Sequence, residues 1–265
     1  MERIDEQAGT TIIPAALLSG PAVSAVKGDH RISVVIPARD EEKTIAAVIS
    51  AVHPYLSDAG QGLIDEVIVV DDGSTDATVA EATSAGARVL SIDGDGKGGA
   101  MRAGVNVAIG DIIVFLDGDV ANMRPNYLPR LVGPLLLNPD VMLVKGHYDR
   151  SFEGAATGGG RVTELAARPI LTLLFPELAS VRQPLAGETA LRREVIETCG
   201  LDNGYRVEIG LLIDVWRTWG IAAIAEVDLG LRIHRNRPLS QLGPMASEVI
   251  AAALERSVIT NVDLT

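Results

Sequence analysis

Short apolar runs that end in polar, acidic or glycine-rich turns recur through the first half of the chain. Three such runs, residues 31–37, 67–70 and 112–116, are rich in Val and Ile, as buried strands are. Between and beside them, we expect a short strand over 88–91, helices over 41–52 and 74–85, and a helix that follows the glycine-rich segment 94–99 and runs through residue 108. This alternation predicts an α/β fold: a mostly parallel sheet with helices on both faces.

The second half of the chain has a less regular pattern. We expect helices and strands in alternation here too, with helices over 125–137, 161–174, 207–219 and after Pro244, strands over 141–144, 184–191 and 221–227, and a loop over 154–160. No linker is long or polar enough to separate two domains, so a single domain is expected. Residues 1–30 are predicted to form a flexible N-terminal arm, and residues 241–265 a C-terminal helix and tail.

Composition narrows the classes of function. The 265 residues are 47% hydrophobic, which suits one large buried core. A net charge of -12 and an aromatic share of 3% argue against nucleic acid as a partner. No apolar run is long enough to span a membrane, and the acidic start lacks the pattern of a secretory signal. Cys199 is the only cysteine, so no intramolecular disulfide can form, and we expect a cytoplasmic protein.

Asp117 and Asp119 directly follow the strand expected at 112–116, with Gly118 between them. Two carboxylates at the end of a buried strand can hold a divalent ion, which in turn holds a diphosphate. We expect Asp119 to bind the ion and Asp117 to contact ribose or complete the coordination. His234, which follows a predicted strand and lies between basic residues, is the candidate for the next ligand.

Polar turns also follow the strands at 31–37 and 67–70. Because loops after neighbouring parallel strands face one crevice, they are the natural lining of a nucleotide-sugar site. Glu41 and Asp72 are our candidates for ribose and base contacts. Lys97 lies within the glycine-rich segment 94–99 at a helix start, where backbone can approach a diphosphate closely and the lysine can neutralise charge.

A second glycine-rich segment, residues 158–160, precedes Arg161 and Thr163 at another helix start. Free backbone amides and an arginine there predict a separate anion site, suited to a phosphorylated or carboxylated acceptor. Glu188 and Glu208 are acids within apolar sequence. A buried charge must be paired or used, so Glu208 either orients a substrate or pairs with Arg206 or Arg232.

These residues resemble the glucosyl-3-phosphoglycerate synthases, retaining GT-A glycosyltransferases of family 81. The segments that carry the resemblance are VVIPARDEEKTI, VIVVDDGSTDAT, DGKGGAM, FLDGD, TGGGRVTELAARP, QPLAGE, VEIGLLID and LGLRIHRNRPL. It covers roughly residue 33 to the final helix. It implies a Rossmann-like GT-A fold with a donor half, residues 31–140, and an acceptor half, residues 141–240.

The resemblance also implies the roles of individual residues. UDP-glucose would be bound by Pro37, Ala38, Glu41, Ser74, Lys97, Asp117 and Asp119, and we add Asp72 and Gly118 to the expected donor site. The acceptor, 3-phosphoglycerate, would be bound by Gly160, Arg161, Val162, Thr163 and Asn236. Mg²⁺ or Mn²⁺ would be held by Asp119 and His234, and Asp119, Lys97 and Glu208 would serve catalysis. Members of the family act as homodimers.

Several positions depart from the family pattern. Asp40 stands where Asn is expected, Gly118 where Ser is usual and Arg206 where Gly is common, and the 150–157 segment is shorter. The main hypothesis is glucosyl transfer from UDP-glucose to the 2-hydroxyl of D-3-phosphoglycerate with retention, by front-face attack. Mannosyl transfer from GDP-mannose, a sugar-phosphate nucleotidyltransferase and a non-catalytic nucleotide-sugar binder are the alternatives.

Overall fold

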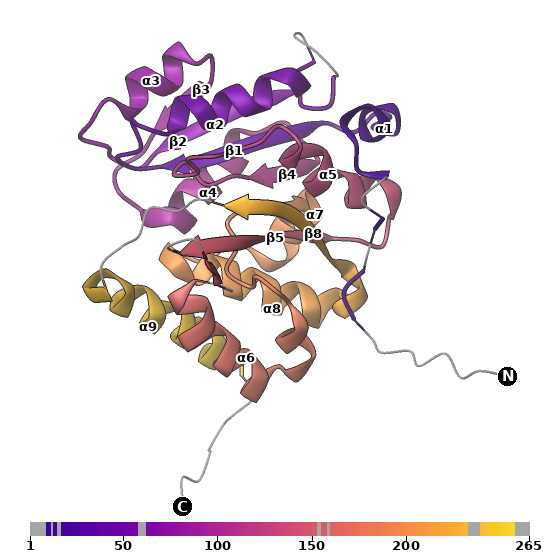
Figure 1. The fold of residues 1–265 in the computed structure, drawn as a ribbon, viewed down its shortest axis with the longest axis vertical. Coiled ribbons are helices and arrows are strands. Elements are labelled where there is room, and N and C mark those ends of the chain that lie inside the picture. Colours follow the sequence, from indigo (N-terminus) through magenta and orange to yellow (C-terminus); the bar gives the residue numbers. More distant parts are fainter. Residues whose placement is uncertain are drawn as a thin grey trace, which may run out of the picture.

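The computed structural model describes residues 9–11, 13–14, 17–57, 62–152, 155–157, 160–232 and 239–257. In this part of the chain one sheet of eight strands forms the centre of the molecule (Figure 1). Its strands are β1 (Ile32–Ala38), β2 (Glu66–Asp71), β3 (Arg88–Ser91), β4 (Ile112–Phe115), β5 (Leu143–Phe152), β6 (Ala155–Thr157), β7 (Thr189–Arg192) and β8 (Ile224–Arg232).

The strand order is β3-β2-β1-β4-β7-β5-β6, and β8 pairs with β5. The first four strands are parallel, as are β5 and β8. β7 is antiparallel to both of its neighbours, so β5 and β8 run in the same direction as β4. The sheet is therefore mostly parallel, as predicted.

Helices cover both faces of the sheet, which confirms the predicted α/β class (Figure 1). They are α1 (Gly20–Ala25), α2 (Ile45–Val52), α3 (Thr78–Ser84), α4 (Gly96–Val107), α5 (Tyr127–Leu137), α6 (Arg168–Leu174), α7 (Arg193–Cys199), α8 (Val207–Trp219) and α9 (Leu239–Glu255). A π-helical turn, Thr163–Ala167, leads into α6. None of the helices in the described segments is long and apolar enough to cross a membrane.

Two apolar cores lie on opposite faces of the sheet. Successive side chains of a strand point to opposite faces, so Val34 and Ile36 of β1 join the core with α1, α2 and α5, while Val35 joins the core with α4 and α8. Burial on both sides explains why the predicted strands read as continuous runs of Val and Ile.

The structure corrects several predicted boundaries. The expected flexible arm, residues 1–30, contains α1, whose Val23 is fully buried in the core beside α5. The loop expected at 154–160 contains β6, a hairpin partner of β5. The strand expected at 184–191 starts only at Thr189, because residues 184–188 form a turn.

Two further boundaries lie near the carboxyl end of the chain. The strand expected at 221–227 begins at Ile224 after a 3-10 turn and continues to Arg232, because it pairs with β5 over most of that strand. The final helix, α9, begins at Leu239, so Pro244 lies inside it instead of before it.

The parallel strands β1, β2 and β4 all end at the same edge of the sheet. Ala38 is the last residue of β1, Asp72 and Asp117 lie in the turns after β2 and β4, and the backbone N–H of Asp72 donates to the carbonyl oxygen of Ala38 at 2.9 Å. This edge is where an open α/β sheet places its ligand crevice.

Candidate active site

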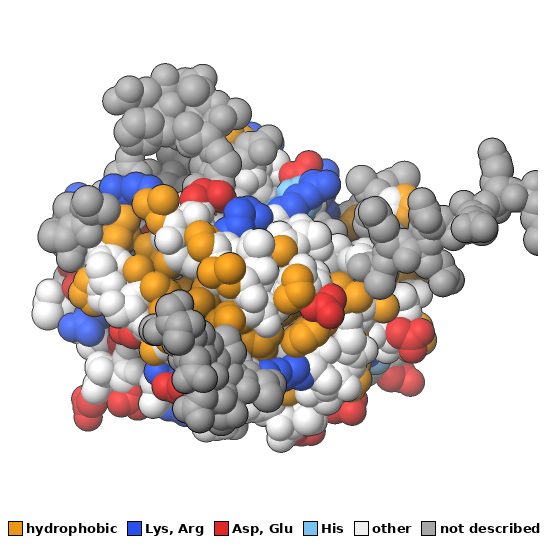
Figure 2. Space-filling model, turned by 90° about the horizontal axis from the view of Figure 1, so that it is seen from below, with side chains coloured by type: hydrophobic (Ala, Val, Ile, Leu, Met, Phe, Trp, Pro, Cys, Tyr) orange, Lys and Arg blue, Asp and Glu red, His pale blue; other side chains and the backbone are white. Residues whose placement is uncertain are grey.

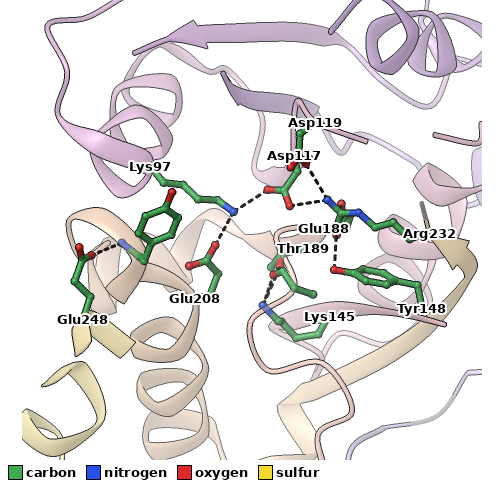
Figure 3. A network of polar contacts seen from close by, with 12 residues as sticks. Lys97, Asp117, Asp119, Lys145, Tyr148, Glu188, Thr189, Glu208, Arg232 and Glu248 are labelled. Atoms are coloured by element: carbon green, nitrogen blue, oxygen red, sulfur yellow. Dashed lines mark hydrogen bonds and ion pairs between the residues drawn. The ribbon is translucent and has the colours of Figure 1, made fainter. Parts of the chain in front are cut away.

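Asp117 and Asp119 lie together at the end of β4, as the strand pattern predicts (Figure 3). The guanidinium of Arg232, from the end of β8, lies against both carboxylates. Its Nη2 is 3.0 Å from Oδ2 of Asp117 and 3.1 Å from Oδ1 of Asp119. The two acids thus share one cation of the protein itself.

Lys97 reaches the same acids from the first turn of α4. Its Nζ is 2.7 Å from Oδ1 of Asp117 and 2.6 Å from Oε1 of Glu208, in the first turn of α8. Burial alone would lower the pKa of Lys97, but the two carboxylates outweigh it and raise that pKa well above its ordinary value. Burial likewise opposes ionisation of Asp117, yet Lys97 and Arg232 hold its pKa well below the usual range. Both groups are therefore charged at neutral pH.

Glu208 was expected to orient a substrate or to pair with Arg206 or Arg232. The pairing expectation is corrected: its partner is Lys97. Arg206 turns instead to Glu255 at the end of α9. Arg232 is taken up by Asp117, Asp119 and a further acid behind it.

That further acid is Glu188, in the turn before β7. One of its carboxylate oxygens is 2.5 Å from Nη1 of Arg232, and the same Nη1 donates to Oη of Tyr148 at 2.9 Å. The guanidinium also lies over the Tyr148 ring, 4.9 Å from its centroid. Burial raises the pKa of Glu188 to about 7, although Arg232 counteracts it. Acidic and basic side chains therefore alternate along one continuous line of ion pairs, which runs through Glu208, Lys97, Asp117, Arg232 and Glu188 (Figure 3).

Lys145 of β5 supports the same turn from below the acids. Its Nζ donates to the carbonyl oxygen of Ala186 at 2.6 Å and to Oγ1 of Thr189 at 3.2 Å. Burial lowers the pKa of Lys145 to about 8, because a charged amine is costly to desolvate. Lys145 thus ties the 186–189 turn to the sheet.

Glycines let the turns approach one another at this edge. A methyl group at Gly118 would lie 3.4 Å from the Pro37 carbonyl oxygen and 3.6 Å from Cβ of Ala38, so the predicted donor turns are in contact. At Gly187, a methyl group would overlap the Asp117 carboxylate. Position 187 therefore needs glycine for close packing.

The remaining donor candidates line the turns after β1 and β2. Oδ2 of Asp72 accepts the backbone N–H of Gly96 at 3.1 Å, while its buried Oδ1 has no partner among the described residues. Oγ of Ser74 accepts the N–H of Asp40, and Oγ1 of Thr78 accepts that of Glu41. The structure thus brings the donor candidates to one edge.

The departure at Asp40 has a physical account. In the part of the chain that is described, it is the one non-glycine residue with a positive φ, 55°. Asn and Asp are the residues that tolerate this backbone region, so aspartate meets the same need as asparagine. Its Oδ1 accepts the Thr75 N–H at 2.8 Å and fixes the two turns together.

The acceptor candidates are described only in part. Gly160 precedes the first helical turn, Arg161 is exposed there, and Val162 and Thr163 are buried. His234 and Asn236, the predicted metal and acceptor ligands after β8, lie outside the described residues.

The described residues fit a divalent cation. Even without Glu188, whose pKa of about 7 leaves it partly protonated at neutral pH, the three carboxylates of Asp117, Asp119 and Glu208 outnumber the two cations that they contact, Lys97 and Arg232, so negative charge is in excess. The Asp119 side chain is 25% exposed and offers the carboxylate oxygens that Mg²⁺ and Mn²⁺ take as ligands. Among the residues described, no group of three or more Asp, Glu, His or Cys side chains is arranged to hold a metal ion by itself.

Sequence reasoning missed the roles of Arg232, Tyr148 and Lys145, and did not foresee what Glu188 binds. An arginine at the end of an apolar strand was a usable signal, because a cation at a strand end faces the crevice. Lys145 had no such signal, because it lies near the start of β5 and is buried beneath the acids.

The comparisons with known proteins agree with this geometry. A family described as glycosyl transferase family 2 matches residues 33–199. The chain is 47% identical to the glucosyl-3-phosphoglycerate synthase of Mycolicibacterium paratuberculosis over 249 residues, which cover 88% of this chain and 74% of the relative. It is 43% identical to that of Petrotoga mobilis, with coverages of 87% and 74%.

Solved structures resemble the fold closely. The glucosyl-3-phosphoglycerate synthase of Mycobacterium tuberculosis, in complex with Mn²⁺, UDP-glucose and phosphoglyceric acid, matches with a TM-score of 0.85 and 46% identity over 94% of this chain and 87% of that one. The same enzyme with Mn²⁺, UDP and glucosyl-3-phosphoglycerate also gives 0.85, at 44% identity and coverages of 96% and 89%. The chain therefore matches the glycosyl transferase family 2 model and belongs to the glucosyl-3-phosphoglycerate synthases.

Proposed function

We propose that this protein transfers glucose from UDP-glucose to the 2-hydroxyl of D-3-phosphoglycerate, in a reaction that requires Mn²⁺ or Mg²⁺. The observation that carries the proposal is the alternating cluster of Lys97, Asp117, Arg232 and Asp119 at the end of β4. It supplies fixed cations for a diphosphate and acids for a divalent ion in one crevice. The solved mycobacterial relative is in complex with Mn²⁺, UDP-glucose and phosphoglyceric acid, which are a divalent ion, a diphosphate donor and an acceptor of the kind proposed here.

The donor nucleotide would lie over the turns after β1 and β2. The buried, unpartnered Oδ1 of Asp72 supports this placement, because a buried carboxylate oxygen needs a donor and the N–H of a uracil base would provide one. Pro37, Ala38, Glu41 and Ser74 complete the wall, and Lys97 and Arg232 face the diphosphate side.

The metal would be held by Asp119 and His234. When bound there, the ion supplies Lewis-acid stabilisation of the leaving diphosphate. Lys97 contributes a second, permanent charge, since its pKa is raised well above the ordinary value by Asp117 and Glu208. The acceptor phosphate would be bound by Gly160, Arg161, Val162, Thr163 and Asn236, at the start of the helix that continues into α6.

Retention of configuration would follow from front-face attack. Double displacement needs a carboxylate nucleophile. Glu208 is held by Lys97, and the fully buried Glu188 is held by Arg232, so both acids in apolar surroundings are already engaged by cations. The acceptor hydroxyl would approach from the side of the departing diphosphate, whose oxygen takes its proton, while Glu208 orients the substrate.

UDP release tests the proposal. With UDP-glucose and Mn²⁺, release should depend on 3-phosphoglycerate, and the product should carry one glucosyl group by mass spectrometry. Turnover with GDP-mannose in place of UDP-glucose would make the protein a mannosyltransferase. Release of diphosphate from a nucleoside triphosphate and a sugar phosphate would make it a nucleotidyltransferase.

The anomeric proton of the product tests retention. A small coupling constant in the NMR spectrum is expected for an α linkage, and a large one, for a β linkage, would contradict retention. A glucosyl adduct on Glu208 or Glu188, found by mass spectrometry, would keep retention but replace front-face attack.

We further infer that the protein works as a homodimer in the cytoplasm. Support comes from the resemblance and from Leu165 and Leu173, which are 75% and 77% exposed in the π-turn and in α6. Figure 2 shows hydrophobic side chains gathered on the face that contains these helices. Light scattering should give twice the chain mass, and a monomer at micromolar concentration would contradict the inference.

A further inference from the structure

Glu188 differs from the other acids of the cluster in its burial. Its side chain has no exposed surface, whereas those of Asp117 and Asp119 keep 20% and 25%. It comes from the turn before β7, which Lys145 fastens to β5. Glu188 is therefore shielded from any substrate by the residue in front of it, Arg232.

Arg232 presents two different ends. Nη1 faces Glu188 and Tyr148 in the interior, and Nη2 faces Asp117 and Asp119 at the crevice (Figure 3). Because the guanidinium is planar and rigid, the partners of one end decide where the other end points. The interior pair thus sets how closely Arg232 approaches the two acids.

Stability alone accounts poorly for a buried glutamate at this position. A buried ion pair repays its desolvation only in part, and apolar replacements of the whole pair are often as stable. A methyl group at Gly146 would lie 2.4 Å from Cδ1 of Leu229 and 3.2 Å from Cβ of Glu188, so an apolar side chain is close to Glu188. The buried ion pair is better explained by its effect on the position of the Arg232 guanidinium.

We propose that Glu188 is a positioning residue, which together with Tyr148 anchors Arg232 so that the guanidinium bonds one oxygen of Asp119 and leaves the other oxygen to a divalent cation. Without this anchor, the guanidinium would move further onto Asp119 and compete with the ion. The inference rests on the proposed function for the identity of the ion, and it concerns only this chain's own residues.

Binding of Mn²⁺ to the protein without substrates tests the proposal through the EPR signal of free Mn²⁺. E188Q should weaken Mn²⁺ binding about tenfold, the factor that about 1.4 kcal/mol gives. Y148F, which removes only the hydroxyl acceptor, should weaken it less but in the same direction. E226Q is the matched control: Glu226 accepts the backbone N–H of Arg182 at 2.7 Å and the Thr10 hydroxyl, and it does not bond Arg232, so loss of its charge should leave Mn²⁺ binding unchanged.

A double-mutant cycle separates positioning from a general structural role. In an R232M background, E188Q should no longer weaken Mn²⁺ binding, because the competing guanidinium is gone. An equal loss in both backgrounds, or unchanged binding in E188Q, would overturn the proposal. Should E188Q fail to fold, Y148F in the two backgrounds makes the same comparison.

Turnover of the wild type distinguishes this proposal from the proposed function. If the wild type releases UDP with 3-phosphoglycerate but E188Q binds Mn²⁺ normally, Glu188 has no positioning role and the function stands. If the wild type shows no such release but the cycle behaves as expected, the positioning holds and the substrate assignment fails.

Discussion

At the scale of single residues, charged side chains that lie far apart in the sequence converge at the end of β4. Asp117 and Asp119 could be placed there from sequence, because acids that directly follow a buried strand lie at the edge of a parallel sheet. Arg232 could not be paired with Glu188 in the same way. Their contact depends on β7 and β8 both lying beside β5, and sequence patterns do not give strand order.

Lys145 gives a pH dependence at this scale. Its pKa is about 8 in the folded state, below the ordinary value of about 10.4 that holds for the unfolded chain. Between pH 8 and about 10.4, Lys145 is protonated in the unfolded chain but largely neutral in the folded protein. The free energy cost of burying the charged amine therefore applies in full below pH 8 and disappears as the pH rises to about 10.4. This residue should therefore raise the unfolding free energy by about 1.4 kcal/mol per pH unit in that window.

Urea unfolding of wild type and K145M at pH 8, 9 and 10 measures this slope. The wild type should have the more positive slope, and K43M, at an exposed lysine in the turn before α2, should match the wild type. Equal slopes for K145M and wild type would show that Lys145 is not the titrating group.

At the scale of elements, most helices and strands of the first half lie within a few residues of their predicted positions. The pattern failed where tertiary contacts decide: α1 packs on α5, and β8 continues along β5. The pattern also did not predict that the first turn of α4 packs against residues 202–204.

Gly98 of α4 yields a prediction for this packing. A methyl group there would overlap the carbonyl oxygen of Asp202, which would displace the first turn of α4 and Lys97 with it. Overpacking of this kind costs about 1–3 kcal/mol. G98A should lower both the thermal unfolding midpoint and the turnover.

G243A is the matched control, because Gly243 lies in α9 and a methyl group there would meet no other atom of the described residues within 4 Å. There the substitution should be neutral or stabilising by about 0.5–1 kcal/mol, since alanine favours helix. Equal effects of the two substitutions on turnover would contradict the inference that packing at Gly98 positions Lys97 in the first turn of α4.

At the scale of the whole molecule, the donor turns and the acceptor candidates lie in different halves of the chain. The two anion sites should therefore be separable. R161A removes a charge-assisted phosphate contact of about 1.5–3 kcal/mol, so the KM for 3-phosphoglycerate should rise by about tenfold or more. Calorimetry should show nearly unchanged UDP affinity, and lost UDP binding with intact acceptor binding would reverse the two assignments.

Our central proposal is that the acid pair at the end of β4 holds the divalent ion on which glucosyl transfer depends. Its most direct test is the rate of UDP release from UDP-glucose with 3-phosphoglycerate by wild type and D119A, each with Mn²⁺ and with excess EDTA. The account predicts that D119A with Mn²⁺ is slower by at least about 100-fold, equivalent to about 2.7 kcal/mol, and that EDTA abolishes wild-type turnover. Near-normal turnover of D119A, or of wild type in EDTA, would contradict it.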